Sequence, residues 1–536
     1  MRLSILIAAI VVLLAGQSFA CLTADLIESL SKNGGTQDKA LYGRPDTQYD
    51  WPTPDGRFRI HYDIDGDNAV YHPDEDVNPH DGIPDYVNRT AEYLGQAYYT
   101  LVLQIGFDPP PSDNYDGGDS RYDIYLTNIP GLTTPENPSD EYPGRPAFTS
   151  FIQLGHDLRN QHYPNDPLPY LKVSVAHEFC HAIQFAYRAY SSDNTPWWFE
   201  ATANWAEEKV FDDVNDVYFY LPTYFSFPYR SLYRTNQFIY GSWIFPEFLD
   251  ERYDAQLIVD CWEKFAGFDF APTAIGYALH EIGTELPYEY CLHVAWNYFT
   301  GPNYLEGFYQ EGADFDTTVA IAKTYFDYPV EWVSEPVQLE NMSSSYIVFR
   351  RQVPGKSNLV IQYFTNAGDR QYVVLAVLRN NILVDMSVNE IDNGVPSTFT
   401  IPDFSLGSKV VMAPVWPYEG EPNSGYTSYA YTAYLDSTQS SAGDINYPIA
   451  GYSLKGAYPN PFNGAVSISF ESPQSSSYIL SVYDISGRRL DKISGNANSG
   501  TNNVNWIPPS NQASGVLFYQ IDINSQRLGG KMSLLK

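Results

Sequence analysis

The spacing of apolar residues changes once along this 536-residue chain, and the change constrains the fold more than any other feature. Between about residues 170 and 300 the apolar residues recur at helical spacing, whereas after about residue 330 they alternate with period two. A chain of this length exceeds what one hydrophobic core normally holds. We therefore predict a multidomain protein, with an α+β domain followed by two β-sandwich-like modules.

Composition places the expected boundaries. The first residues combine Arg2, an apolar run and the small-x-small ending Ser18–Ala20, which is typical of a secretory signal peptide. Cys21 follows directly, so lipidation is an alternative fate of this end. The expected parts are a signal peptide (1–20), a leader or propeptide-like segment (21–50), the α+β domain (51–330), a β-sandwich-like domain (331–436), a Ser/Gly-rich linker (437–452) and a terminal β module (453–536).

The strongly acidic net charge argues against some classes of binding partner. Asp and Glu total 64 against 31 Lys and Arg, which gives a net charge of −33. No basic stripe is available to neutralise phosphate, so we expect neither a nucleic acid nor an anionic membrane as partner. After the signal peptide no stretch is long and apolar enough for a transmembrane helix.

Several segments upstream of residue 170 have a recognisable period. The pattern predicts a strand at Phe58–Tyr62, a helix at Tyr86–Ile105 and a second strand at Tyr122–Leu126. A proline-rich connection, Pro130–Pro146, is expected to precede a third strand at 147–154. Residues 22–50 show no clear period.

The segment His177-Glu178-Phe179-Cys180-His181 combines spacing with chemistry. Residues four apart lie on one face of a helix, so the two imidazoles can bind one ion, with Glu178 beside it as general base. The surrounding helix is apolar nearly all round, so these polar groups are buried and need a cation or hydrogen bonds. Two histidines satisfied by hydrogen bonds alone are the alternative. We expect Cys180 to serve in helix packing.

Glu200 is the candidate third ligand. It follows Thr195-Pro196, an expected helix start, and a catalytic zinc site uses three protein ligands with one open position. An exposed helix carboxylate is the alternative. Asn204 and Glu207 share its helix face, so either residue could orient a ligating histidine from behind.

Within W-x-x-E-x-x-A-x-W-x-E, this HExxH plus downstream Glu resembles the gluzincin metallopeptidases over about residues 50–300, most closely a group of secreted bacterial members. The resemblance implies Zn²⁺ bound by His177, His181 and Glu200, with Glu178 as general base and a protein or peptide as substrate. It also implies a group that stabilises the oxyanion, for which Tyr240 is our candidate. The Gly-x-Met-Glu-Asn segment of aminopeptidases is missing, which favours an endopeptidase.

An acidic loop offers oxygen ligands near a Gly turn, which is how calcium loops are built. It resembles the D-x-N-x-D-G-I-P-D loops of extracellular calcium-binding repeats, but His80 interrupts it. A solvated turn is the alternative to Ca²⁺. The candidate ligands are Asp74, Asp76, Asn78, Asp81 and Asp85.

The tail carries three motifs, Ala457–Asn463, Val482–Arg488 and Ser514–Tyr519. Together they resemble the C-terminal sorting domain of type IX secretion, a small Ig-like β-sandwich. The resemblance implies contact with the outer-membrane secretion machinery. It also implies a secreted or outer-membrane-surface location in a Gram-negative-type bacterium. A related flagellar-hook-cap module is the alternative.

These features together indicate a secreted zinc endopeptidase. A surface adhesin or binding protein with an inactive peptidase-like domain is one alternative, and a zinc hydrolase with a non-peptide substrate is another. The intact Glu178 favours an enzyme over the adhesin. Cys261 and Cys291 are expected either to form a disulfide or to be two small buried apolar residues.

Overall fold

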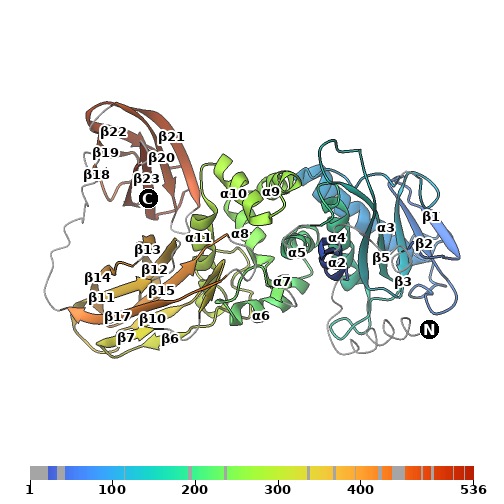
Figure 1. The fold of residues 1–536 in the computed structure, drawn as a ribbon, viewed down its shortest axis with the longest axis horizontal. Helices are drawn as coiled ribbons and strands as arrows, with labels where there is room; N and C mark the ends of the chain where they lie inside the picture. Colours follow the sequence, from blue (N-terminus) through green and yellow to red (C-terminus); the bar gives the residue numbers. More distant parts are fainter. Residues whose placement is uncertain are drawn as a thin grey trace. The chain divides into compact units, whose positions relative to one another are not determined.

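The chain is described here by a computed structural model that covers most of its length (Figure 1). The expected signal peptide, Cys21 and the expected linker at 437–452 lie outside the described residues. The described ranges are 22–32, 43–113, 115–190, 196–234, 238–334, 338–365, 370–392, 394–419, 425–436, 453–472, 475–484, 488–510, 512–523 and 526–536.

The chain forms two compact units, and the main division falls after Leu286 rather than at the expected residue 330. The second unit begins at Pro287 and includes the short segment Glu251–Tyr253, while Glu419 belongs to the first. The earlier division has a structural reason. Strands β6 (Lys323–Tyr325) and β7 (Val330–Ser334) pair with β10 and β17 of the second unit, so they belong to its sheets.

A mixed five-stranded sheet forms the first part of the first unit, in the order β1-β2-β3-β5-β4. The central strands β2, β3 and β5 are parallel to one another, whereas β1 and β4 are antiparallel additions at the two edges. All six residues of β3 are buried, as expected of a central strand. The bounds are β1 Tyr49–Pro52, β2 Phe58–Tyr62, β3 Tyr122–Thr127, β4 Gly131–Pro138 and β5 Phe148–Gly155.

The edge strand β4 corrects one expectation, because the sequence predicted only a proline-rich connection there. Pro135 and Pro138 remove two backbone donors, but an edge strand tolerates this on its unpaired side. From Gly131 to Pro135 the strand pairs regularly with β5. Among the described residues, its other edge does not pair with a strand of this sheet.

Helices α3 and α4 contact this sheet, and α5 packs beside α4 (Figure 1). The predicted helix at 86–105 is present as α3 followed by the π-helix η1. Helix α4 is buried on nearly every side from Val173 onward, as its composition predicts. The bounds are α3 Asp85–Tyr98, η1 Tyr99–Ile105, α4 Leu168–Gln184, α5 Trp197–Val210, η2 Asp216–Tyr220, α6 Leu221–Ser226, α7 Phe238–Gly241, α8 Ile244–Arg252, α9 Gln256–Gly267 and α10 Ala271–Glu281.

The segment expected to lack a period contains a helix, α2 (Thr23–Lys32), as well as strand β1. Farther along this segment, Arg44 is bound by three carboxylates. Its guanidinium contacts Asp113 at 2.9 Å, Glu136 at 2.7 Å and also Asp123. Both ends of this segment are therefore packed against the first unit.

The β-rich part of the second unit follows helix α11 (Leu286–Tyr298) and the turn η3 (Gly301–Asn303). One sheet has the order β13-β12-β15-β10-β6 with β9 beside β15, a second has the order β14-β11-β17-β7, and β16 pairs with β8. These sheets agree with the period-two pattern of the sequence. The remaining bounds are β8 Leu339–Glu340, β9 Ser343–Ser344, β10 Ile347–Arg350, β11 Lys356–Thr365, β12 Gln371–Arg379, β13 Ile382–Ile391, β14 Ser397–Ser405, β15 Ser408–Trp416, β16 Tyr426–Thr427 and β17 Tyr429–Asp436.

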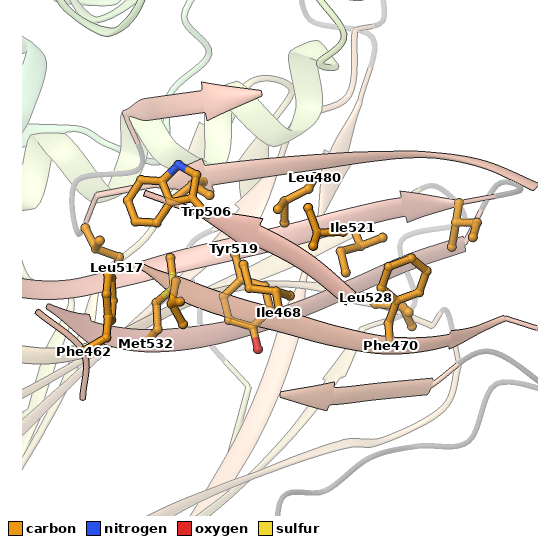
Figure 2. Close-up of a cluster of buried hydrophobic side chains, with 14 of the residues drawn as sticks. Phe462, Ile468, Phe470, Leu480, Trp506, Leu517, Tyr519, Ile521, Leu528 and Met532 are labelled. Carbon is orange, nitrogen blue, oxygen red and sulfur yellow. The ribbon is translucent and has the colours of Figure 1, made fainter. Parts of the chain in front are cut away.

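The terminal module consists of two antiparallel sheets, β18-β19-β22 and β21-β20-β23-β24. Figure 2 shows its apolar side chains gathered between the strands, with Phe462 and Trp506 in edge-to-face contact at 6.1 Å. Alternation of buried and less buried residues is clear along β19 and β23. The bounds are β18 Ser453–Tyr458, β19 Val466–Ser472, β20 Ser476–Tyr483, β21 Arg489–Ala497, β22 Gly500–Trp506, β23 Gly515–Ile523 and β24 Gln526–Leu534.

Across the residues that the structure describes, none of the helices has both the length and the apolar character needed to cross a membrane.

Candidate metal centre

Helices α4 and α5 bring His177, His181 and Glu200 together inside the first unit. The Nε2 atoms of the two histidines are 3.1 Å apart. Glu200 Oε1 lies 3.2 Å from His181 Nε2, and Oε2 lies 3.5 Å from His177 Nε2. The four-residue spacing on α4 places both rings on one face, and Glu200 faces them from the first turn of α5. The three side chains predicted as ligands therefore converge.

The far side of each ring is held by a hydrogen-bond acceptor. His177 Nδ1 lies 2.7 Å from Glu207 Oε1, and His181 Nδ1 lies 2.8 Å from Gln184 Oε1. The orientation of the Gln184 amide follows from its nitrogen, which donates to Phe199 O and to Thr202 Oγ1. Each ring therefore donates its Nδ1–H outward, which leaves the Nε2 lone pairs directed at the centre.

With both rings in this tautomer, two imidazole Nε2 atoms and the Glu200 carboxylate face one another. His181 and Glu200 are fully buried, and neither Glu200 oxygen accepts a well-aligned hydrogen bond from the described residues. Burial alone would raise the pKa of Glu200, but the neighbouring His181 and His177 lower it to about 2. Such a group of acceptors is costly unless a cation binds among them. A His₂Glu donor set fits Zn²⁺.

The Glu178 carboxylate lies against the edge strand β4 and lines the same pocket as His177. Its Oε2 accepts a hydrogen bond from Thr133 Oγ1 at 2.7 Å, and its carboxylate is buried. A Cβ atom at position 131 would lie 2.5 Å from Glu178 Oε1, so only glycine allows this approach. The same oxygen that binds Thr133 also accepts a hydrogen bond from Thr23 Oγ1 at 3.1 Å.

The two residues expected behind the ligands have different roles. Glu207 holds His177 by a hydrogen bond, which is one of the two alternatives proposed. Burial raises the pKa of the Glu207 carboxyl to about 7, although the hydrogen bond with His177 lowers it. Asn204 does not hold a histidine. Its amide donates to the backbone oxygen of Tyr240 at 2.9 Å, and so fixes the position of α7.

Tyr240 is buried and lines the same pocket as His177 and Glu178. Its ring lies 5.2 Å from that of Tyr220. Its role toward an oxyanion stays a prediction. Other residues of this pocket were not anticipated from the sequence, namely Pro130, Gly131, Tyr170, Val173, Ser174, Asp216 and Tyr220.

The cysteines of the described residues are not ligands of this centre. Cys180 Sγ donates to the Thr202 carbonyl at 3.5 Å, and burial raises its pKa to about 12, in agreement with a packing role. Cys261 and Cys291 are both buried and free. Of the two alternatives for this pair, the structure therefore shows buried apolar residues and no disulfide.

In the acidic loop, carboxylates accept hydrogen bonds from backbone N–H groups of the same loop. Asp76 accepts from the N–H groups of Asp81 and Gly82, and Asp85 accepts from those of Val77 and Asn78. No three acidic side chains of this loop, all of which is described, bring their oxygens within 4.8 Å of one another. Asp74 is not part of such a group either. Calcium binding at this loop stays a prediction.

Two family models match parts of the chain. Residues 456–533 match a secretion system C-terminal sorting domain, which is the address of type IX export. The protein is therefore secreted or held at the cell surface, and its terminal module contacts the secretion machinery. Residues 168–284, from α4 to α10, match a family of unknown function (DUF6055). The matched range includes His177, His181 and Glu200, but the family's function is unknown, so the match gives the candidate centre no activity.

No curated protein matches the chain. Solved structures similar to part of it include a GH2 β-galacturonidase from Eisenbergiella tayi bound to glycerol, at 10% identity and a TM-score of 0.14, covering 36% of this chain and 35% of that one. Dimeric latent PorU from Porphyromonas gingivalis is similar at 13% identity and a TM-score of 0.14, covering 39% and 20%. The chain thus spans about a third or less of these proteins, and at these TM-scores neither similarity bears on activity.

Proposed function

We propose that the protein is an exported zinc-dependent endopeptidase of the gluzincin type, with an α+β zincin-like domain around the centre. In this proposal His177, His181 and Glu200 hold the zinc ion, and Glu178 is the general base. The observation that carries the proposal is the buried group of two imidazole Nε2 atoms and one carboxylate, which lie 3.1 to 3.5 Å from one another.

The orientation of Glu178 supports a role in proton transfer. A zinc ion, when bound, acidifies water and polarises a carbonyl oxygen. The Glu178 carboxylate lies beside the ligands and faces β4, so it takes the proton from the attacking water and returns it to the leaving nitrogen. Thr133 holds one of its oxygens by the 2.7 Å hydrogen bond, which fixes the carboxylate for both transfers.

The edge strand β4 supports a peptide as substrate. An extended chain binds an exposed sheet edge through backbone hydrogen bonds, and β4 is the edge strand next to Glu178. The Gly131 carbonyl and the Thr133 N–H point outward along this edge. Tyr240 is our candidate for stabilising the oxyanion that develops on the scissile carbonyl.

The test combines metal content with hydrolysis of casein-derived peptides by the purified full chain. We expect one zinc per chain, retained in Glu178→Gln with kcat lower by about 10² to 10⁴. His181→Ala should lose both the zinc and the hydrolysis. The matched control is Lys172→Ala on the same helix, which removes the ion pair with Asp213 and a cation–π contact with Phe211. Absence of zinc, or full hydrolysis in Glu178→Gln, would contradict the proposal, and cleavage of esters but not peptides would favour another hydrolase.

A further inference from the structure

The N-terminal segment lies directly against the outer edge of β4. Leu22 N–H donates to the Gly131 carbonyl at 3.2 Å, and Thr133 N–H donates to Thr23 Oγ1 at 2.8 Å. These are the outward-facing backbone groups that an extended peptide would use to bind the edge strand. Residues 22 and 23 therefore already occupy them.

Helix α2 continues from this contact and is fixed by its apolar side. Leu26 and Leu30 are buried against Leu132 of β4, and Ile27 is fully buried. Ile129 and Tyr190 pack around the same cluster. A helix of ten residues is marginal by itself in water, so α2 depends on this packing for its structure.

The first residue of α2 also touches Glu178. Thr23 Oγ1 donates to Glu178 Oε2 at 3.1 Å, and the Thr23 side chain is fully buried. With Thr133 on the same oxygen, Glu178 Oε2 accepts two hydroxyl hydrogen bonds. The Thr23 hydroxyl thereby occupies a hydrogen-bonding position on this carboxylate, and the Thr23 side chain takes up space beside it.

We propose that residues 22–32 are a built-in inhibitor of the candidate centre, which hold Glu178 and the β4 edge until the segment is displaced. This inference rests on the proposed function and deepens it, because it assigns the regulation of the same site. The chain is held again at Arg44, whose guanidinium binds Asp113 and Glu136. A cut between residues 32 and 43 would therefore free α2 without disturbing the anchor at Arg44.

Two released forms test the inference. In the first, Leu26→Asp with Leu30→Asp removes the apolar contact with β4. In the second, a site-specific protease sequence replaces residues 35–41, so the chain folds with α2 in place and is then cut. The control is Ser29→Ala, an exposed position on the same helix. We expect both zinc-loaded released forms to hydrolyse a quenched fluorescent peptide at least tenfold faster than the parent and the Ser29→Ala control.

A second readout does not depend on hydrolysis. A fluorescent synthetic peptide of residues 22–32 should bind the cut form, measured by anisotropy, and the same peptide with Thr23→Val should bind at least tenfold more weakly. Failure of the peptide to bind, or equal hydrolysis by parent and released forms, would overturn the inference. Binding of the peptide without hydrolysis by any zinc-loaded form would instead refute the proposed function, while residues 22–32 would remain the occupant of the site.

Discussion

The centre depends on the protonation of single ring nitrogens, which residues outside the ligand set decide. Gln184 keeps His181 in the tautomer that presents Nε2 inward, and Glu207 does the same for His177. Without such partners an imidazole places its proton on either nitrogen and rotates more freely. The affinity for a metal therefore depends on these two acceptors as well as on the ligands.

The role of Gln184 predicts how much zinc affinity should fall when its side-chain acceptor is removed. Gln184→Leu removes the acceptor for His181 Nδ1–H and should lower zinc affinity by about 10- to 100-fold. Gln184→Glu keeps an acceptor oxygen and should recover most of that loss. Zinc affinity is measured by competition with a chromogenic chelator. Gln96→Leu, which removes a hydrogen bond to the Val210 carbonyl elsewhere in the unit, is the control. Unchanged affinity in Gln184→Leu would show that the acceptor is dispensable.

Gly131 gives a second prediction, which separates metal binding from proton transfer. In Gly131→Ala the new methyl group would lie 2.5 Å from Glu178 Oε1, so the carboxylate must move away. We expect zinc to be retained and kcat to fall by about 10² or more, because only the base is displaced. Gly95→Ala in α3, where a Cβ meets nothing within 4 Å, should leave kcat unchanged. Normal turnover in Gly131→Ala would argue against Glu178 as the base.

Helices and strands with a clear hydrophobic period could be predicted from the sequence. Elements that are defined only by the strands or helices they pack against could not. The helix ligands follow from i, i+4 spacing on α4, and Gln184 follows His181 by three residues, so the same spacing could have identified it. Thr133 and Gly131 come from a strand whose Pro135 and Pro138 are typical of a loop. Nothing within β4 itself indicates that it is an edge strand, since that depends on β5, which lies later in the chain.

The N-terminal segment was missed for a related reason. Leu26, Ile27 and Leu30 have helical spacing, but a ten-residue amphipathic stretch is too short to stand out from its polar surroundings. Its position against β4 is a long-range contact that no local pattern contains. The Arg44 anchor is also long-range, because its carboxylates lie 69, 79 and 92 residues away.

The Arg44 anchor predicts how stability depends on pH. Burial and the nearby Asp123 raise the pKa of Asp113 to about 7, against the opposing effect of Arg44. A carboxyl with a higher pKa in the folded state binds its proton more tightly there. Its contribution to the free energy of unfolding is therefore full below about pH 4 and is lost as the pH rises to about 7.

Asp113→Asn should remove this dependence, because the amide stays neutral. We expect its melting temperature to vary less than that of the parent between pH 4 and 7, and to be the higher of the two at pH 7. Asp119→Asn is a control of opposite sign, since the hydrogen bond from Arg59 lowers the pKa of Asp119. That variant should be less stable than the parent throughout pH 4 to 7, because the contribution of Asp119 is lost only as the pH falls below about 4. Parallel pH profiles for Asp113→Asn and the parent would contradict the assignment.

At the scale of the whole molecule, the candidate chemistry and the cellular address lie in different parts of the chain. Every residue of the candidate centre lies between Thr23 and Tyr240, in the first unit. The sorting domain begins after residue 452 and has its own apolar core. A module with a separate core can fold independently, so the sorting domain should also direct the export of another protein to which it is fused.

This separation predicts that residues 437–536 alone direct export. Fused to the C-terminus of a signal-peptide-bearing carrier, in a bacterium with type IX machinery, they should move the carrier to the surface or medium, as immunoblots of cell fractions would show. Phe462→Ala removes a ring packed on Trp506 and should cost about 3–5 kcal/mol. For a domain with ~5–15 kcal/mol of stability, that loss should reduce the exported amount and increase proteolysis. Ile507→Ala, at an exposed position, should be exported normally. A fused carrier that stays in the periplasm would show that export needs further parts of this chain.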